Sequence, residues 1–445
     1  MNNFIIPPLD PDFSPLSVFS RSYLEKTENE GGKEIIIGLV NENYSYEYRT
    51  SVFLTGHEDE TSKYISFIIK SLLWIYGASS IYISDENIYR LLCKLFSKGG
   101  ILSSDAEEMK SYYGDFCVIK GRMPAKAKRE IKKKEDKSAD IIGLDIGCTG
   151  RKVCAVSDGK VVFSSNMPWT PKEYTSLEII KEKIKESINS ASEYLKKVDK
   201  IGISTAGVCS ENKVITSTVF NGIKESEQKI SQTLYIDAAR ELGIKNITVI
   251  NDGDAAAFSA VINDGLSDVL GISLGTGLGG GYVDENGLIT GIINELEFVP
   301  IDSSSLACDF GKDGCAAEYL SSKAVIKLAE KCGISFSEKM TPGEKVLYVS
   351  NLLERGNKEV YNIYKTIGIY LGYAICHYSY FYKMKHVKVM GGITMGQGGE
   401  IIRDMAKKVL EAEFPPEKMP HMFFADDKSR LLGQAYAAAF LPILD

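Results

Sequence analysis

The sequence predicts an α/β protein with two lobes, preceded by a further α/β region. Strands and helices alternate from Ile141 onward, an order typical of a mixed sheet covered by helices. Glycine-rich loops directly follow apolar strands at residues 145–152 and 274–281. A lysine-dense segment, residues 121–140, separates these elements from the N-terminal part. Two glycine-marked α/β halves imply a cleft between two lobes.

Composition narrows the class of protein. The chain has 445 residues, enough for two or three domains, and its 44% hydrophobic and 25% charged residues are ordinary for a globular protein. The formal net charge of -7 argues against a nucleic-acid partner. Nine cysteines, scattered and odd in number, predict no disulfide framework and favour a reducing cytoplasm. The start lacks a signal peptide, and the most apolar window, 64–76, contains Lys70. We therefore expect a soluble, cytoplasmic protein without a membrane partner.

Residues 1–136 are expected to form an N-terminal α/β accessory domain that ends in the lysine-rich segment. A hairpin of residues 34–40 and 46–54, a helix at 64–74 and a short strand at 80–84 are predicted in it. The lysine-rich segment is either a solvated linker or an anion-binding patch, and charge patterning favours the linker. The order of elements resembles the start of the next lobe, through a degenerate copy or through convergent packing.

The first lobe is expected at 137–260 and the second at 261–445. Strands are predicted at 141–145, 152–156, 160–164, 200–204, 247–250, 269–274, 279–283 and 287–292. Helices are predicted over the apolar stripe from Leu177 to Leu195, near 227–242, over 360–384 and as a closing helix at 428–441. His377 lies among apolar residues of the long helical stretch, so we interpret it as a packed core histidine.

Three segments carry the candidate chemistry. Asp145 ends a strand and opens the loop GLDIGCTGRK, where a carboxylate could hold Mg²⁺ through water and Thr149 could contact phosphate oxygens; a structural turn explains such a string equally well. Asp252 follows another strand, as a reactive carboxylate or as a helix N-cap. The glycines of 274–281 let backbone N–H groups approach a phosphate. A carboxylate beside a phosphate cradle indicates phosphoryl transfer.

The order of these segments, followed by residues 387–392, is similar to the phosphate, catalytic and adenosine segments of the actin–hexokinase superfamily. More closely, residues 140–444 resemble the ROK (repressor, open reading frame, kinase) family of sugar kinases and sugar-responsive regulators. The resemblance implies a two-lobed actin/hexokinase-like (ribonuclease H-like) fold, ATP and Mg²⁺ as cofactors, and a small-molecule sugar as substrate.

The resemblance also implies roles for single residues. Asp252 corresponds to the catalytic base, and Asn251, Glu295 and Glu318 correspond to sugar-binding residues, although Glu318 lies one position later than the family's glutamate. Asp145 would also be the Mg²⁺ ligand. The nucleotide would be bound by Asp145, Gly147, Thr149, Gly275, Thr276, Gly277, Gly279, Gly391 and Gly392.

The sequence departs from the family pattern at the sugar edge. Phe298 replaces a histidine that contacts sugar and ligates zinc, and Phe310 replaces another zinc ligand. Cys308 and Cys315 alone do not complete a tetrahedral site, so structural zinc is not expected, and binding of any other metal by them stays open. Losing the histidine should change which hydroxyls are recognised.

Two further positions differ from the family. Asp254 stands where many members carry asparagine, and it either alters the sugar site or faces solvent. Arg151 and Lys152 replace a single lysine after the first loop; either could contact the phosphates, and Lys152 is assigned to the next strand.

We therefore expect an ATP- and Mg²⁺-dependent carbohydrate kinase whose lobes close to exclude water. Two alternatives are a sugar-responsive regulator and a catalytically silent nucleotide-binding scaffold. A regulator should carry a helix-turn-helix in its N-terminal region, where strands are predicted instead. That region could cover the cleft, mediate dimerisation or recruit a partner, and a homodimer is the expected assembly.

Overall fold

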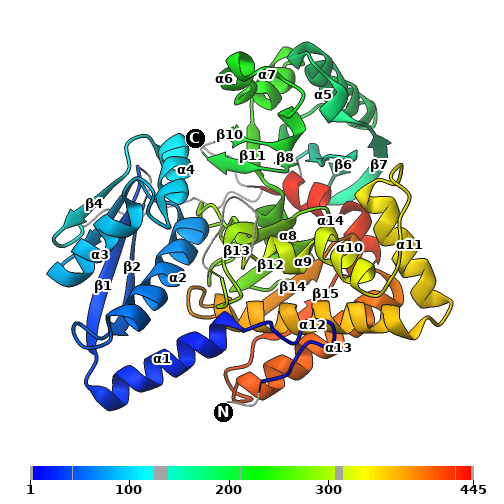
Figure 1. Cartoon of the computed structure of the whole chain (residues 1–445). Helices are drawn as coiled ribbons and strands as arrows, with labels where there is room; N and C mark the ends of the chain where they lie inside the picture. Colours follow the sequence, from blue (N-terminus) through cyan, green and yellow to red (C-terminus); the bar gives the residue numbers. More distant parts are fainter. Residues whose placement is uncertain are drawn as a thin grey trace.

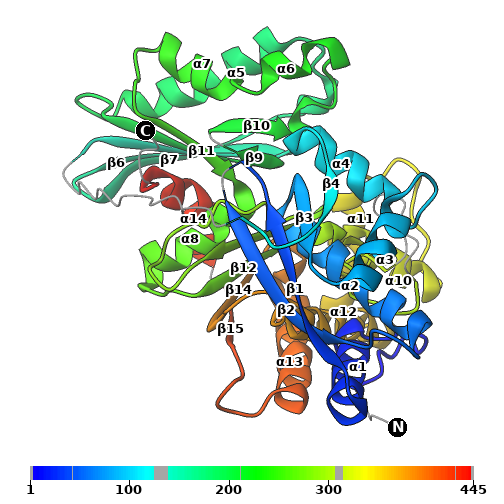
Figure 2. The ribbon, with the colours of Figure 1, turned by 90° about the vertical axis from the view of Figure 1, so that its left-hand side faces the viewer.

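The computed structural model describes residues 4–42, 44–124, 139–210, 212–305, 314–425 and 427–441. Three larger sheets, each with helices packed against it, organise the molecule (Figures 1 and 2). Their strand orders are β2-β1-β3-β4 in the N-terminal region, β11-β8-β5-β6-β7 in the first lobe and β13-β12-β14-β15 in the second. The predicted fold class, a mixed α/β protein with an additional N-terminal α/β region, is confirmed. No helix of the described residues is long and apolar enough to cross a membrane.

The N-terminal region contains the predicted hairpin, helix and short strand. Its elements are α1 (Leu16–Glu30), β1 (Lys33–Val40), β2 (Ser45–Val52), α2 (Glu58–Tyr76), β3 (Ser80–Ile83), α3 (Glu86–Phe96), α4 (Ser103–Tyr113) and β4 (Cys117–Lys120). Strand β3 pairs antiparallel with β1. The corresponding pair of the first lobe, β8 with β5, is parallel. This difference in direction argues for convergent packing and against a degenerate copy.

The first lobe brings three strand ends to one edge. β5 pairs in parallel with β8, and β8 pairs in parallel with β11, so the carboxyl ends of all three lie together. This is the edge that carries Asp145 and Asn251. The elements are β5 (Ile141–Ile146), β6 (Gly150–Ser157), β7 (Lys160–Pro168), α5 (Leu177–Ser192), β8 (Lys200–Thr205), β9 (Val208–Ser210), β10 (Lys213–Thr216), α6 (Gln228–Ser231), α7 (Leu234–Glu241), β11 (Ile247–Asn251) and α8 (Asp252–Asp264).

The second lobe contains most of the predicted strands and helices. Its elements are β12 (Val269–Leu274), β13 (Leu278–Val283), α9 (Ala317–Leu320), α10 (Ser322–Lys331), α11 (Pro342–Glu354), α12 (Lys358–Tyr378), β14 (His386–Met390), α13 (Gly396–Glu413), β15 (His421–Phe424) and α14 (Asp427–Ala439). The 3₁₀ helices are η1 (Pro171–Glu173), η2 (Thr218–Phe220), η3 (Glu225–Glu227), η4 (Leu296–Phe298) and η5 (Gly392–Thr394).

Two predictions for the second lobe were wrong. Residues 287–292 form no strand; Ile289 makes only an isolated bridge to Val283, because Gly287 and Gly291 take positive φ values of 70° and 73° and turn the backbone away. Helix α12 ends at Tyr378, where the predicted helical stretch continued to residue 384. The interpretation of His377 is confirmed: it is fully buried, its Nε2 lies 2.9 Å from Ser71 Oγ, and burial lowers its pKa to about 3.

The N-terminal region and the second lobe share one hydrophobic core, whereas the first lobe has a core of its own. The rings of Phe13 and Tyr370 lie 4.7 Å apart, and Leu16 N donates to Ile301 O at 2.9 Å. A hydrogen bond between Ser71 and His377 links α2 to α12. The region that precedes the lysine-rich segment is therefore packed against the second lobe (Figure 1).

The closing helix α14 packs against the sheet of the first lobe. A Cβ on Gly143 of β5 would overlap the carbonyl oxygen of Ala435, and one on Gly202 of β8 would overlap that of Ala438. Helix backbone and strand backbone are thus in direct contact, which only glycine permits on the strands. Figure 2 shows α14 between this sheet and α8.

Replacing Gly143 by alanine should separate α14 from the sheet. We expect Gly143→Ala to lower the free energy of unfolding by about 1–3 kcal/mol, or to prevent folding, as overpacking does in other cores. Gly343→Ala is the matched control, because a Cβ at Gly343 on exposed α11 meets nothing within 4 Å. Thermal denaturation of both variants checks this; equal melting temperatures would contradict the close contact.

Candidate active site

The first candidate loop follows β5 and is braced by Trp169. Gly147 N donates to Gly150 O at 2.9 Å, which closes the turn. Trp169 Nε1 donates to Gly147 O at 2.7 Å, and Trp169 N donates to Thr149 O at 3.3 Å. The side chain of Thr149 stays exposed. The loop is therefore held by Trp169 and exposed at residues 148 and 149.

Asp145 lies buried at the same edge, 5% exposed. Ser204 Oγ donates to its Oδ1 at 3.0 Å, and Lys152 Nζ lies 3.2 Å from its Oδ2. Arg151 points to the opposite face of β6, as alternation along a strand requires, where it contacts Ser187 Oγ at 2.8 Å. Of the two basic residues that the sequence left open, Lys152 is the one at the site.

Asn251 and Asp252 lie next to each other at the start of α8 but have different contacts. Asn251 is the N-cap: its Oδ1 accepts from Gly253 N at 2.6 Å and from Asp254 N at 3.3 Å, and its Nδ2 donates to Gly207 O at 2.7 Å. The N-cap considered for Asp252 is therefore made by its neighbour. The Asp252 carboxylate lies beside the second glycine loop, with its Oδ1 3.7 Å from a Cβ built on Gly279.

The second glycine loop lies directly against Asp252. A Cβ on Gly279 would lie 3.7 Å from Asp252 Oδ1. In the turn 275–277, of which Thr276 and Gly277 are exposed, Gly275 N donates to Gly277 O at 3.0 Å and closes the turn. Ser322 anchors this turn, because its N donates to Gly275 O at 2.9 Å and its Oγ donates to Thr276 O at 3.1 Å.

The predicted adenosine segment borders the same loop. Gly391 follows β14 with φ 110°, and a Cβ there would overlap the carbonyl oxygen of Leu274. Gly392 is exposed beside it. The fold thus brings the ends of β5, β11, β12 and β14, with their candidate nucleotide-binding residues, to one region.

The residues 294–298, which we call the acceptor loop, add carboxylates to the site. Burial and the negative charge of Asp145 raise the pKa of Asp252 to about 7. The pKa of Glu295 is raised well above its usual range by burial, then by Glu297, Asp252 and Asp254. Burial also raises the pKa of Glu297, whose Oε2 lies 3.2 Å from a Cβ built on Gly277. Glu297 is a site residue that the sequence prediction missed; its place two residues after Glu295 was the available signal.

Asp254 faces the interior and not solvent. It is 7% exposed, and its Oδ1 accepts from Tyr282 N at 3.3 Å and from Asn294 Nδ2 at 3.0 Å. Tyr382 OH in turn donates to Asn294 Oδ1 at 2.9 Å. Asp254 therefore joins α8 to β13 and to the acceptor loop. Burial raises its pKa to about 7.

Glu318 does not join this cluster. It lies on α9, its Oε1 is 3.2 Å from Lys323 Nζ, and it borders a surface pocket together with Asp10 and Tyr370. No contact between Glu318 and Asn251, Asp252 or Glu295 is seen among the described residues. Its assignment to the sugar stays a prediction without geometric support.

The predicted zinc segment is only partly described. Cys308 and Phe310 lie outside the described residues; Cys315 is buried, and its Sγ is 3.4 Å from Phe298 O. Within the described part of the chain, no three His, Cys, Asp or Glu side chains converge as metal ligands. Phe298 itself packs against Trp74 with the two rings tilted by 41° and their centroids 4.3 Å apart.

Comparison with known proteins identifies the family. The sequence pattern of the ROK family matches residues 141–439. The chain belongs to the ROK family. This ROK protein is 28% identical over 196 residues to a glucokinase of Streptomyces coelicolor, and the match covers 43% of the chain and 59% of the glucokinase. The chain thus spans less than two thirds of the length of that relative.

Two solved structures share the fold. A ROK glucokinase from Streptomyces griseus in complex with glucose and AMPPNP superposes with a TM-score of 0.53 at 22% identity, covering 68% of the ROK protein and 98% of the glucokinase. A ROK transcriptional regulator, a homologue of the E. coli MLC protein, has a TM-score of 0.53 at 18% identity. The match covers 68% of the ROK protein and 78% of the regulator. The neighbours thus include both a kinase and a regulator. They establish the actin/hexokinase-like fold of residues 141–439, and the N-terminal region lies outside it.

Replacing Asp254 by asparagine should change how stability depends on pH. The folded-state pKa near 7 exceeds the ordinary value of about 3.9, so the wild type loses stability as pH rises through this window. Asp254→Asn lacks this loss. Its melting temperature should gain on the wild type by about 3 °C or more between pH 5 and pH 8. The exposed Asp115→Asn is the control, and a gain that is equal at both pH values would contradict the raised pKa.

Proposed function

We propose that this ROK protein transfers the γ-phosphoryl group of ATP to a hydroxyl of a sugar or sugar derivative, with Asp252 as general base. The observation that carries the proposal is the Asp252 carboxylate, which lies against the second glycine loop and has a pKa of about 7. A base with a pKa near the working pH is deprotonated often enough to act and basic enough to accept a proton.

The other residues divide between the two substrates. The N–H groups of Gly147 and Gly275 close their own turns, so phosphate oxygens would be bound by the exposed remainder of the two loops, residues 148–149 and 276–277. Lys152 adds a cation at the first loop. The acceptor would lie between Asp252 and the acceptor loop, where the Glu295 carboxyl group can bind its hydroxyls. Asp252 takes the hydroxyl proton as the phosphoryl group transfers in line.

The donor set at Asp145 fits Mg²⁺. This ion is commonly bound through one or two carboxylates together with substrate phosphates, so the buried carboxylate of Asp145 would be sufficient, although the described residues contain no cluster of three metal-ligating side chains. When bound, it would neutralise the charge that develops on the phosphates. Asp145 would hold it, and Ser204 would orient the Asp145 carboxylate through the bond to Oδ1.

The similarity to glucokinases supports the kinase, and the similarity to a regulator keeps the alternative testable. The described part of the N-terminal region is built around the sheet β2-β1-β3-β4. A DNA-binding regulator would be expected to present a helix-turn-helix there. This difference favours the enzyme.

Asp252→Asn should separate chemistry from binding. We expect turnover to fall by about 10²-fold or more, because the amide cannot accept the proton, with nucleotide affinity unchanged. ADP release with ATP and Mg²⁺ would be measured over hexoses, amino sugars, N-acetylated sugars, β-glucosides and polyols. Asp264→Asn, at the other end of α8, is the control. Unchanged turnover in Asp252→Asn would refute the role, and a wild type silent with every acceptor that still binds ATP would favour a regulator or scaffold.

The pH dependence of kcat/KM should follow Asp252. Below pH of about 7 the carboxylate is protonated, so kcat/KM should fall about tenfold per pH unit. The charge of Glu297 contributes to raising the pKa of Asp252. In Glu297→Gln the acidic limb of the pH profile, where kcat/KM falls, should therefore move to lower pH. Glu193→Gln, exposed at the end of α5, should leave the profile in place. A limb that does not move in Glu297→Gln would contradict the proximity of the two carboxylates.

A further inference from the structure

The C-terminal end of α2 is capped by the acceptor loop. The last carbonyl groups of a helix have no partner within it. In α2, Glu295 N donates to Trp74 O at 2.8 Å, and Asn294 N donates to Ile75 O at 3.0 Å. A helix from the N-terminal region and the loop that carries Glu295 therefore satisfy each other's backbone groups.

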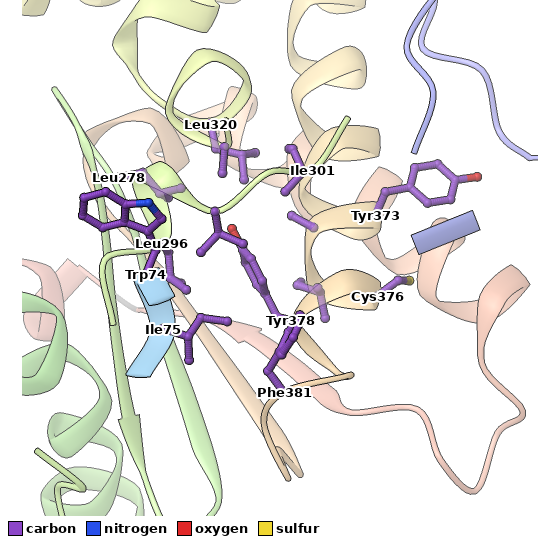
Figure 3. Close-up of a cluster of buried hydrophobic side chains, with 14 of the residues drawn as sticks. Trp74, Ile75, Leu278, Leu296, Ile301, Leu320, Tyr373, Cys376, Tyr378 and Phe381 are labelled. Carbon is purple, nitrogen blue, oxygen red and sulfur yellow. The ribbon is translucent and has the colours of Figure 1, made fainter. Parts of the chain in front are cut away.

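Side chains reinforce this contact. The indole of Trp74 is 1% exposed and packs on Phe298 at 4.3 Å between centroids. Its Nε1 donates to Asp105 Oδ1 of α4 at 2.6 Å, and Lys70 Nζ lies 2.9 Å from the same oxygen. Figure 3 shows Trp74 and Ile75 beside Leu278 of the second glycine loop and Leu296 of the acceptor loop. Asp105 of α4 binds the indole nitrogen, and Lys70 of α2 binds the same carboxylate oxygen, so residues of both helices fix the orientation of the indole.

Contacts from several elements hold the acceptor loop at Asn294. This residue has φ 51°, a left-handed conformation that asparagine adopts more readily than most residues with a side chain. Three bonds to other elements fix it there: from its N to Ile75 O, from Tyr382 OH to its Oδ1, and from its Nδ2 to Asp254. The first of these three comes from the N-terminal region.

We propose that α2 is part of the catalytic unit and that Trp74 is a positioning residue, which fixes the acceptor loop and thereby orients Glu295 for the acceptor. The inference rests on the proposed kinase function. Helix α4 reaches the same place: Tyr112 packs edge-on against Trp74 at 6.4 Å, and after burial, the charge of Glu295 is the next cause that raises the pKa of Tyr112 and of Tyr113.

The positioning role of α2 can be separated from its role in the core. Tyr64 lies on the same helix, is fully buried, stacks on Tyr23 at 4.3 Å and contacts Thr50 Oγ1 at 2.6 Å. None of these partners belongs to the acceptor loop. Tyr64→Leu therefore removes a buried ring of α2 without touching the loop, and it is the matched control for Trp74→Leu.

The test compares Trp74→Leu, Trp74→Phe and Tyr64→Leu with the wild type, in full-length protein. In Trp74→Leu, hydrogen exchange at the amides of 294–298 should rise about tenfold or more. The value of kcat/KM for the acceptor should fall about 10- to 100-fold, with KM for ATP within about twofold, because misplaced binding groups act on the acceptor alone. Trp74→Phe keeps a ring against Phe298 and should restore most of the loss.

Tyr64→Leu should lower the melting temperature but leave loop exchange and acceptor kinetics near wild type. If Trp74→Leu changes exchange and kinetics no more than Tyr64→Leu does, α2 is only a scaffold and the inference is overturned. Should Trp74→Leu fail to fold, Asp105→Asn removes the ion pair with Lys70 and should shift both readouts in the same direction. Hydrogen exchange needs no turnover, so a wild type without kinase activity would refute the proposed function while exchange still decides the positioning role.

Discussion

The close backbone contact between α8 and β13 is the constraint on which the rest of the site depends. A Cβ on Gly253 would overlap Gly280 O, and one on Gly281 would overlap Gly253 O, so the first turn of α8 lies directly on the strand. This contact places Asp252 beside Gly279, where the residue is only partly exposed. The close approach of the two backbones thereby contributes to the desolvation that raises the pKa of Asp252 to about 7.

Helices α14 and α2 hold the segments around this contact. Gln434 Nε2 of α14 donates to Asp252 O at 2.9 Å, and the carbonyl groups of Trp74 and Ile75 accept from the acceptor loop. Such bracing is needed because the site gathers buried carboxylates: burial first, and then the negative charge of the neighbouring carboxylates, raises the pKa values of Asp252 and Glu295. A cluster of this kind costs stability, and the surrounding packing must offset it.

Sequence patterns correctly predicted the features that depend only on neighbouring residues. The strands that end at Asp145 and Asn251, and the glycine loop at 274–281, were predicted at their observed places because apolar runs followed by turn residues need no distant partner. Three positions could not be predicted in this way: the interior position of Asp254, the position of Lys152 in place of Arg151 beside Asp145, and the position of Glu297 at the site. They depend on which face a side chain takes and on contacts between residues far apart in the sequence. The strand wrongly predicted at 287–292 shows the same limit, since β-branched residues there lack a partner strand.

The departure at residue 298 and the additional N-terminal region are best understood together. A histidine at this position, which the family resemblance implies, could anchor the acceptor loop through a ligand or hydrogen bond; phenylalanine can offer only its ring. In this chain the ring packs on Trp74, and the polar part of the anchor is supplied by the carbonyl groups of Trp74 and Ile75 at the end of α2, which accept from the acceptor loop. A helix from outside the ROK fold thereby takes over the orientation of Glu295. The loss of a polar side chain in the loop is compensated by backbone acceptors from another region, which explains why that region shares its core with the second lobe.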